Sequence, residues 1–156
     1  KDFLAGKIYE TGNIEDYPAF SKIIFLILQE FSILKEVAHK LAGDTVVSDY
    51  VRCGHVACAM LTDKGNVYTG ISINAKCGIG FCAEHSAIAD MLKAGEKRIV
   101  KLVAASENSV VVSCGRCLEF IRQLDNENVN TKILLPNGEV KLLSDLLPVR
   151  WDINEL

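Results

Sequence analysis

The chain has 156 residues, of which 49% are hydrophobic and 24% are charged, which is the ordinary balance of a globular protein. This length suits a single domain, so we expect one domain over residues 1–156. The formal net charge is −3. Its lysines and arginines are scattered, whereas a protein that binds a phosphate backbone normally carries a basic patch. The composition therefore favours a small-molecule partner over nucleic acid.

The six cysteines stand in an apolar-rich chain, unlike the core-poor frameworks of small secreted proteins. We therefore expect reduced thiols and a cytoplasmic location. The strongest apolar run, residues 23–28, is far shorter than the ~20 residues that span a bilayer. No basic amino-terminal segment precedes it, as one would in a signal peptide, so we expect no membrane partner.

The first regular element in chain order is a helix that begins near Ala19, after an irregular stretch at 1–18. Gly43 ends this helix. Its apolar side chains recur at three- and four-residue steps, the spacing of one helix face, at Phe20, Ile24, Ile27, Phe31 and Leu34. The wide apolar face predicts burial in the core or against a neighbouring subunit.

The elements that follow have the order β-β-α-β-α-β-β, which predicts an α/β domain whose sheet is covered by helices. Strands are expected over 51–61, 67–73, 99–105, 132–135 and 139–143. Helices are expected over 82–93 and 114–124, with a last helical turn near Asp145. Within the domain, residues 1–47 form an amino-terminal extension and helix, and residues 48–156 form the core that carries the chemistry.

Two cysteine motifs stand at the expected helix starts. Cys82-Ala83-Glu84 opens one helix, and Cys114-Gly115-Arg116-Cys117 opens the other. Three thiolates would supply the protein ligands of a catalytic zinc, which keeps a fourth position open. A helix amino-terminus favours negative charge by ~0.3–1 kcal/mol, which helps a thiol to ionise. Glu84 can face the same pocket without being a ligand, where a general acid/base is needed.

These motifs, CAEH at 82–85 and SCGRC at 113–117, resemble the signature of the zinc deaminases. From about residue 56 to residue 147 the chain is similar to the small cytidine deaminases, including an LLP segment at 146–148. It is also similar to blasticidin-S deaminase, which shares the CGRC segment, the LLP and a following tryptophan, here Trp151.

The resemblance implies a three-layer α/β/α fold with a five-stranded mixed sheet. It also implies Zn²⁺ on Cys82, Cys114 and Cys117, Glu84 as the acid/base, and assembly as a homotetramer, with a homodimer as the alternative. Ser72, Asn74 and Ala83 are the positions at which we expect contact with substrate.

The chain departs from the family pattern at five positions. Ser113 replaces a proline, and His85 replaces an arginine. Ser72 and Asn74 stand where cytidine deaminases have an Asn-x-Glu segment that holds ribose, and Gly54 stands where they have an aromatic residue. Catalysis is therefore expected to follow the family, whereas recognition of the sugar is expected to differ.

Some site assignments stay open at this stage. A zinc ion with three thiolates is negatively charged, and either Arg116 or a protonated His85 could offset that charge. Cys77 and His55 are candidates for the pocket wall, and Trp151 for a lid or an anchor.

The predicted function is zinc-dependent hydrolytic deamination of a cytosine-type free nucleoside or nucleoside analogue, with release of ammonia. A blasticidin-S-type deaminase, or another aminopyrimidine or aminopurine deaminase, is the alternative. A polynucleotide-editing deaminase is disfavoured because no basic, aromatic-laced segment is present. A non-catalytic zinc protein of the same fold would need a fourth ligand, such as His85.

Overall fold

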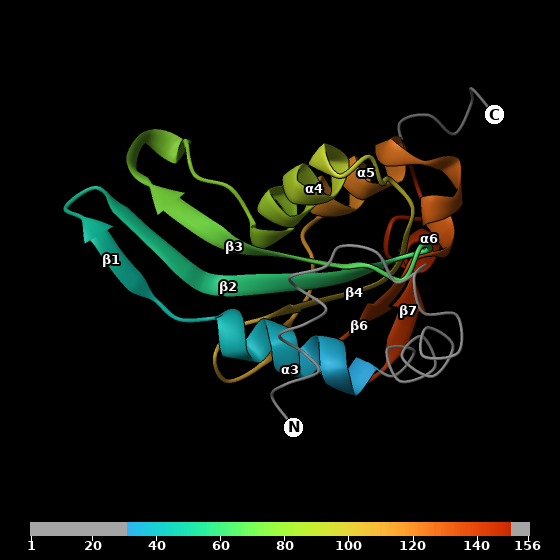
Figure 1. Ribbon diagram of the computed structural model, residues 1–156, viewed down its shortest axis with the longest axis horizontal. Coiled ribbons are helices and arrows are strands. Elements are labelled where there is room, and N and C mark those ends of the chain that lie inside the picture. Colours follow the sequence, from blue (N-terminus) through green and yellow to red (C-terminus); the bar gives the residue numbers. More distant parts are fainter. Residues whose placement is uncertain (1–30, 151–156) are drawn as a thin grey trace.

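The structure is a computed structural model that describes residues 31–150. Within this range one mixed sheet carries helices on both faces (Figure 1). Its strands are β1 Thr45–Ser48, β2 Val51–Thr62, β3 Val67–Ala75, β4 Ile99–Ala105, β5 Val110–Val111, β6 Lys132–Leu134 and β7 Val140–Leu142. The helices are α3 Phe31–Leu41, α4 Ala83–Lys93, α5 Gly115–Leu124 and α6 Leu143–Leu146, with short 3-10 turns η2 Lys76–Gly78 and η3 Asn126–Asn130.

The strand order is β1-β2-β4-β6-β7, with β3 on the other side of β2 and β5 beside β4. The β4–β6 pair is parallel, and the other strand pairs are antiparallel. The predicted α/β class and mixed sheet are confirmed. The predicted number of strands is wrong, because the sheet has seven strands in the described residues and not five.

The two strands that sequence reasoning missed lack the alternation that marks a half-buried strand. All four residues of β1 are exposed, and β5 is only two residues long. The helix predicted from Ala19 is seen only from Phe31 onward, because the residues before it, including the apolar run at 23–28, lie outside the described residues, as does Trp151. In the described range, no helix has the length and apolar character needed to cross a membrane.

The core has two layers, one on each face of the sheet. Alternate residues of β2 point to opposite faces. Cys58 and Met60 belong to the apolar cluster that includes side chains of α4 and α5, whereas Ala59 and Leu61 belong to the cluster that includes α3. Figure 1 shows the same arrangement, with α4 and α5 on one face and α3 on the other. The α/β/α layering is thus confirmed.

Helix α4 packs very closely on β3 at Gly70. A Cβ atom at this position would lie 2.2 Å from Ser86 Oγ and 2.4 Å from the Ala83 carbonyl oxygen. The Ser86 hydroxyl also crosses the interface, because it donates to the carbonyl of Ile71 at 3.1 Å. The absence of a side chain at residue 70 therefore sets where the first turn of α4 lies.

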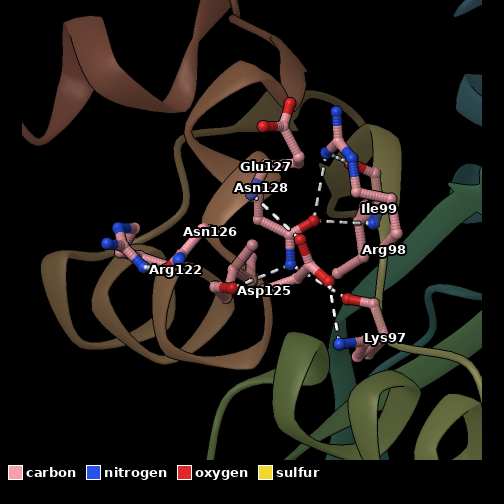
Figure 2. A network of polar contacts seen from close by, with 9 residues as sticks. Lys97, Arg98, Ile99, Arg122, Asp125, Asn126, Glu127 and Asn128 are labelled. Carbon is pink, nitrogen blue, oxygen red and sulfur yellow. Dashed lines mark hydrogen bonds and ion pairs between the residues drawn. The ribbon is translucent and has the colours of Figure 1, made fainter.

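Behind α5, a buried asparagine ties η3 to the sheet (Figure 2). The Asn128 side chain is fully buried. Its Oδ1 accepts from the Ile99 amide at 2.8 Å and from Arg98 Nη1 at 3.1 Å. Its Nδ2 donates to the carbonyls of Ile121 at 2.9 Å and Lys97 at 3.0 Å. All four hydrogen-bonding positions of the amide are used, so this side chain fixes the end of α5 against the start of β4.

Candidate active site

Two cysteines occupy equivalent positions at the starts of α4 and α5. Cys82 is the N-cap of α4 with φ −71° and ψ 157°, and Cys114 is the N-cap of α5 with φ −71° and ψ 161°. Neither side chain forms a capping hydrogen bond with its own helix, so both thiols are available to other partners. Cys117 is buried in the first turn of α5. The two helix starts place all three thiols at one spot.

The three sulfurs form a single cluster. Cys82 Sγ lies 3.8 Å from Cys114 Sγ, which lies 3.5 Å from Cys117 Sγ, and all three atoms are within 4.8 Å of one another. Sulfur ligands ~2.3 Å from a tetrahedral zinc stand ~3.8 Å apart, so this spacing fits one ion. Among the described residues, no other group of three metal-ligating side chains exists. All six cysteines of the chain are free thiols.

The surroundings act differently on the three thiols. Burial raises the pKa of Cys117 and of Cys82. Burial also acts to raise the pKa of Cys114, but hydrogen bonds from the Cys117 amide and from the thiols of Cys117 and Cys82 lower it on balance. Three thiolates so close together repel one another, and a bound cation would stabilise all three. The donor set is that of a soft or borderline metal such as zinc.

Glu84 lies beside the sulfur cluster, in the first turn of α4. Its side chain is only 3% exposed, yet it lines a cavity. After the larger effect of burial, its charge raises the pKa of Cys117 and of Cys58. Cys82 and Cys114 line the same cavity. Among the described residues, no hydrogen bond or ion pair holds this carboxylate. A buried carboxylate without a partner is costly unless it serves a ligand or a reaction.

The cavity has a volume of about 520 Å³. This size is typical of small-molecule sites, which span ~300–1,000 Å³. Each face of the cavity comes from a different element. Side chains that matter for its chemistry are His55 of β2, Ser72 and Asn74 of β3, Ala83 and Glu84 of α4, and Arg116 of α5.

The three residues expected to contact substrate all line this cavity. Ser72 is 7% exposed, and its hydroxyl accepts a hydrogen bond from the Val56 amide at 3.0 Å. Asn74 is exposed at the end of β3, and Ala83 is buried at the start of α4. Their contact with a substrate stays a prediction.

His85 lies apart from the sulfur cluster and does not line the cavity. Its ring packs against Phe120, with 5.1 Å between ring centroids. Burial, followed by the nearby charge of Arg116, lowers the pKa of His85, which favours the neutral ring. In the described part of the chain, the sulfur cluster therefore has no fourth ligand from His85 or from any other histidine, cysteine or carboxylate.

The other candidates lie mostly outside the cavity. Cys77 is exposed in the turn after β3, with φ 61°, and does not line the cavity. Gly54 is absent from the cavity wall. A further histidine, His39 on α3, lies outside the cavity and hydrogen-bonds the Ser106 carbonyl at 2.7 Å. Residues 111–112 also line the cavity, and sequence reasoning missed them because β5 is too short to show a pattern.

The family of this chain is shown by its sequence similarity to a curated relative. The chain is 32% identical over 99 residues to a cytidine deaminase of Halalkalibacterium halodurans, and the match covers 60% of this chain and 74% of the relative. This chain belongs to the cytidine deaminase family. No family model matches the sequence.

Solved structures of the cytidine deaminase family agree with this membership. The enzyme from Mycobacterium leprae superimposes with a TM-score of 0.64 at 26% identity, covering 77% of this chain and 98% of its own. The enzyme from Mycobacterium tuberculosis superimposes with a TM-score of 0.66 at 27% identity, covering 78% of this chain and 97% of its own. The shared region thus includes nearly the whole of each of these cytidine deaminases.

Proposed function

We propose that this chain is a zinc-dependent hydrolase that removes the exocyclic amine of a cytosine-type free nucleoside or nucleoside analogue as ammonia. The observation that carries the proposal is a cluster of three thiols, two of which line the same cavity as the buried, unpartnered Glu84. The cytidine deaminases to which the chain is similar support the reaction type.

In this proposal Cys82, Cys114 and Cys117 hold the zinc. When bound, zinc supplies a Lewis acid that makes water nucleophilic at neutral pH. The three sulfurs suit this role because their spacing fits one tetrahedral ion and leaves a coordination position without a protein ligand.

Glu84 moves the protons of the reaction. Its carboxylate takes a proton from the attacking water and passes it to ring nitrogen 3, and a further transfer protonates the departing amine. A C4–O bond forms, the C4–N bond breaks, and water and substrate become the keto product and ammonia. The low exposure of Glu84 keeps bulk water from competing for these protons.

Arg116 is the residue that offsets the negative charge of the thiolates. It lines the cavity from the first turn of α5, and its side chain is exposed. His85 is poorly suited to this role because its pKa is lowered and its ring packs on Phe120.

The decisive experiment incubates the purified, zinc-supplemented protein with cytidine, deoxycytidine and blasticidin S, and follows ultraviolet absorbance and ammonia. Turnover of at least one substrate supports the proposal and ranks the nucleoside and blasticidin-S alternatives. A zinc-loaded protein that is inert toward a wide panel of aminopyrimidines and aminopurines would contradict it, and would favour a non-catalytic zinc protein.

Assembly and location follow the same family expectation. We infer a homotetramer in the cytoplasm, with one domain per chain, and sedimentation analysis of the purified protein tests the oligomeric state.

A further inference from the structure

Strand β2 contains a large bulge at the wall of the cavity. The pairing of β2 with β3 passes from Cys53 opposite Ile73 to Ala57 opposite Ile71. Three residues of β2 therefore lie opposite Ser72 alone. Bulges of this kind are common beside active sites, where they turn a side chain out of the regular alternation of the strand.

The backbone of the bulge is held by a hydrogen bond on each side of His55. The Val56 amide donates to Ser72 Oγ at 3.0 Å, and the Gly43 amide donates to the Gly54 carbonyl at 2.8 Å. Gly54 has φ 85°, and a Cβ atom there would lie 2.2 Å from the Gly43 carbonyl oxygen. The backbone on either side of His55 is therefore fixed by contacts that need a glycine at position 54.

His55 is the bulge residue whose side chain remains available. It is exposed and lines the cavity, and among the described residues its ring has no hydrogen bond or ion pair. It lies on an exposed part of the cavity wall, whereas Glu84, only 3% exposed, lies on a buried part. A substrate whose reacting ring faces Glu84 and the sulfurs would extend its remaining substituent toward His55.

The exposed part of the cavity wall around His55 is polar. An imidazole ring offers hydrogen-bonding nitrogens, and the carboxamide of Asn74, also exposed on the cavity wall, offers both a donor and an acceptor. Hydroxyl groups both donate and accept. Glu84 is the only carboxylate among the described residues that line the cavity. Asp44, the acidic group whose charge interacts with His55, lies outside the cavity wall and is already bound by Arg52 at 2.6 and 3.1 Å.

We propose that His55 is a specificity-determining residue that hydrogen-bonds a hydroxyl of the substituent carried by the substrate ring, in the nucleoside case the sugar. This inference rests on the proposed deaminase activity. Ser72 is less suited to the same role, because its hydroxyl oxygen already accepts from the bulge amide. His55 contacts a part of the substrate that does not react, so it contributes equally to binding before and during the reaction.

The test compares His55→Ala with wild type on cytidine, and with free cytosine as a competitive inhibitor that lacks a sugar. His55→Ala should raise KM for cytidine about two- to twelvefold, the range for loss of one neutral hydrogen bond, and leave kcat unchanged. The inhibition constant of cytosine should not change. His55→Gln, which keeps a donor and an acceptor, should restore most of the KM.

His39→Ala is the matched control, since it removes the same side chain from a helix outside the cavity, and its kcat and KM should equal those of wild type. Thermal unfolding of each variant separates lost binding from lost folding. An unchanged KM for cytidine in a folded His55→Ala, a fall in kcat alone, or an equal loss for cytosine would overturn the inference. A wild-type protein without turnover would instead refute the proposed function on which the inference rests.

Discussion

Replacing Gly70 with alanine tests whether the contact between β3 and α4 positions the site. The new Cβ atom would lie 2.2 Å from Ser86 Oγ and 2.4 Å from both the Ala83 carbonyl oxygen and the Ala87 amide nitrogen. Ser86 could rotate away, but the other two atoms belong to the backbone of α4. Restoring ordinary contact distances requires α4 to move by about 1 Å, because a close-packed interior has no spare space. Glu84 lies in the same turn and must move with it.

Two effects of Gly70→Ala should be measurable. Overpacking should lower the free energy of unfolding by about 1–3 kcal/mol, or the melting temperature by about 2–12 °C. A displacement of this size in a catalytic group can reduce turnover about a hundredfold, so kcat/KM should fall by about 10- to 100-fold even where the protein is fully folded. Circular dichroism and the deamination assay at 20 °C measure the two quantities.

Gly43→Ala is the matched control, because a Cβ atom there would meet its nearest neighbour, Glu107 Oε1, at an ordinary 3.8 Å. Its stability and turnover should stay near those of wild type. A Gly70→Ala protein with unchanged melting temperature and unchanged kcat/KM would refute the view that α4 lies directly on β3 and that this contact sets the position of Glu84.

Three further predictions address the metal, the proton shuttle and the fold. Glu84→Gln should keep zinc, measured by elemental analysis, but reduce kcat by at least about 10²–10⁴-fold, and retained turnover would assign the shuttle to another group. Chelation of the metal should abolish turnover and lower the melting temperature, and added zinc should restore both. Added zinc should not restore turnover in the Cys117→Ser variant. A fully active apoprotein would contradict zinc dependence. Asn128→Ala should lower the free energy of unfolding, measured in urea, by about 2–3 kcal/mol, because buried backbone groups lose their hydrogen-bond partners. Asn130→Ala, at an exposed position, should change this free energy little. Equal effects of the two substitutions would refute the structural role of Asn128.

The sequence predicted the elements that show a strong local signal. Strand β4 has the predicted limits. Strand β2 and helix α4 begin and end within one residue of the predicted limits. The positions of the cysteine motifs at helix starts could be predicted because each motif directly precedes an apolar pattern with helical spacing. Cys82 and Cys114 fall at N-caps, where the helix amino-termini favour the negative charge of a thiolate.

The rest depends on contacts between segments that are distant in the chain. Gly70 is visible in the sequence, but nothing local says that Ser86 lies above it. The bulge around His55 has a weak signal, an isolated glycine inside a strand pattern, which is compatible with several backbone paths. Sequence spacing therefore indicated the residues that we propose to carry the chemistry, whereas the cavity wall around them is formed by tertiary contacts of single residues.

The charge of the proposed centre explains why it stands between two helix starts. With zinc in place, three thiolates and a divalent ion carry a net charge of about −1, and the Glu84 carboxylate adds a second negative charge close by. The amino-termini of α4 and α5 each contribute about half a positive charge. Arg116 at the first turn of α5 contributes a full one, and in the described residues no acidic side chain forms an ion pair with it. Together these positive charges would offset the negative ones, so that a zinc ion held by the three thiolates could supply Lewis-acid chemistry. Arg116→Ala should accordingly lower kcat more than it lowers zinc content, whereas an equal loss of both would mean that the arginine serves only to retain the metal.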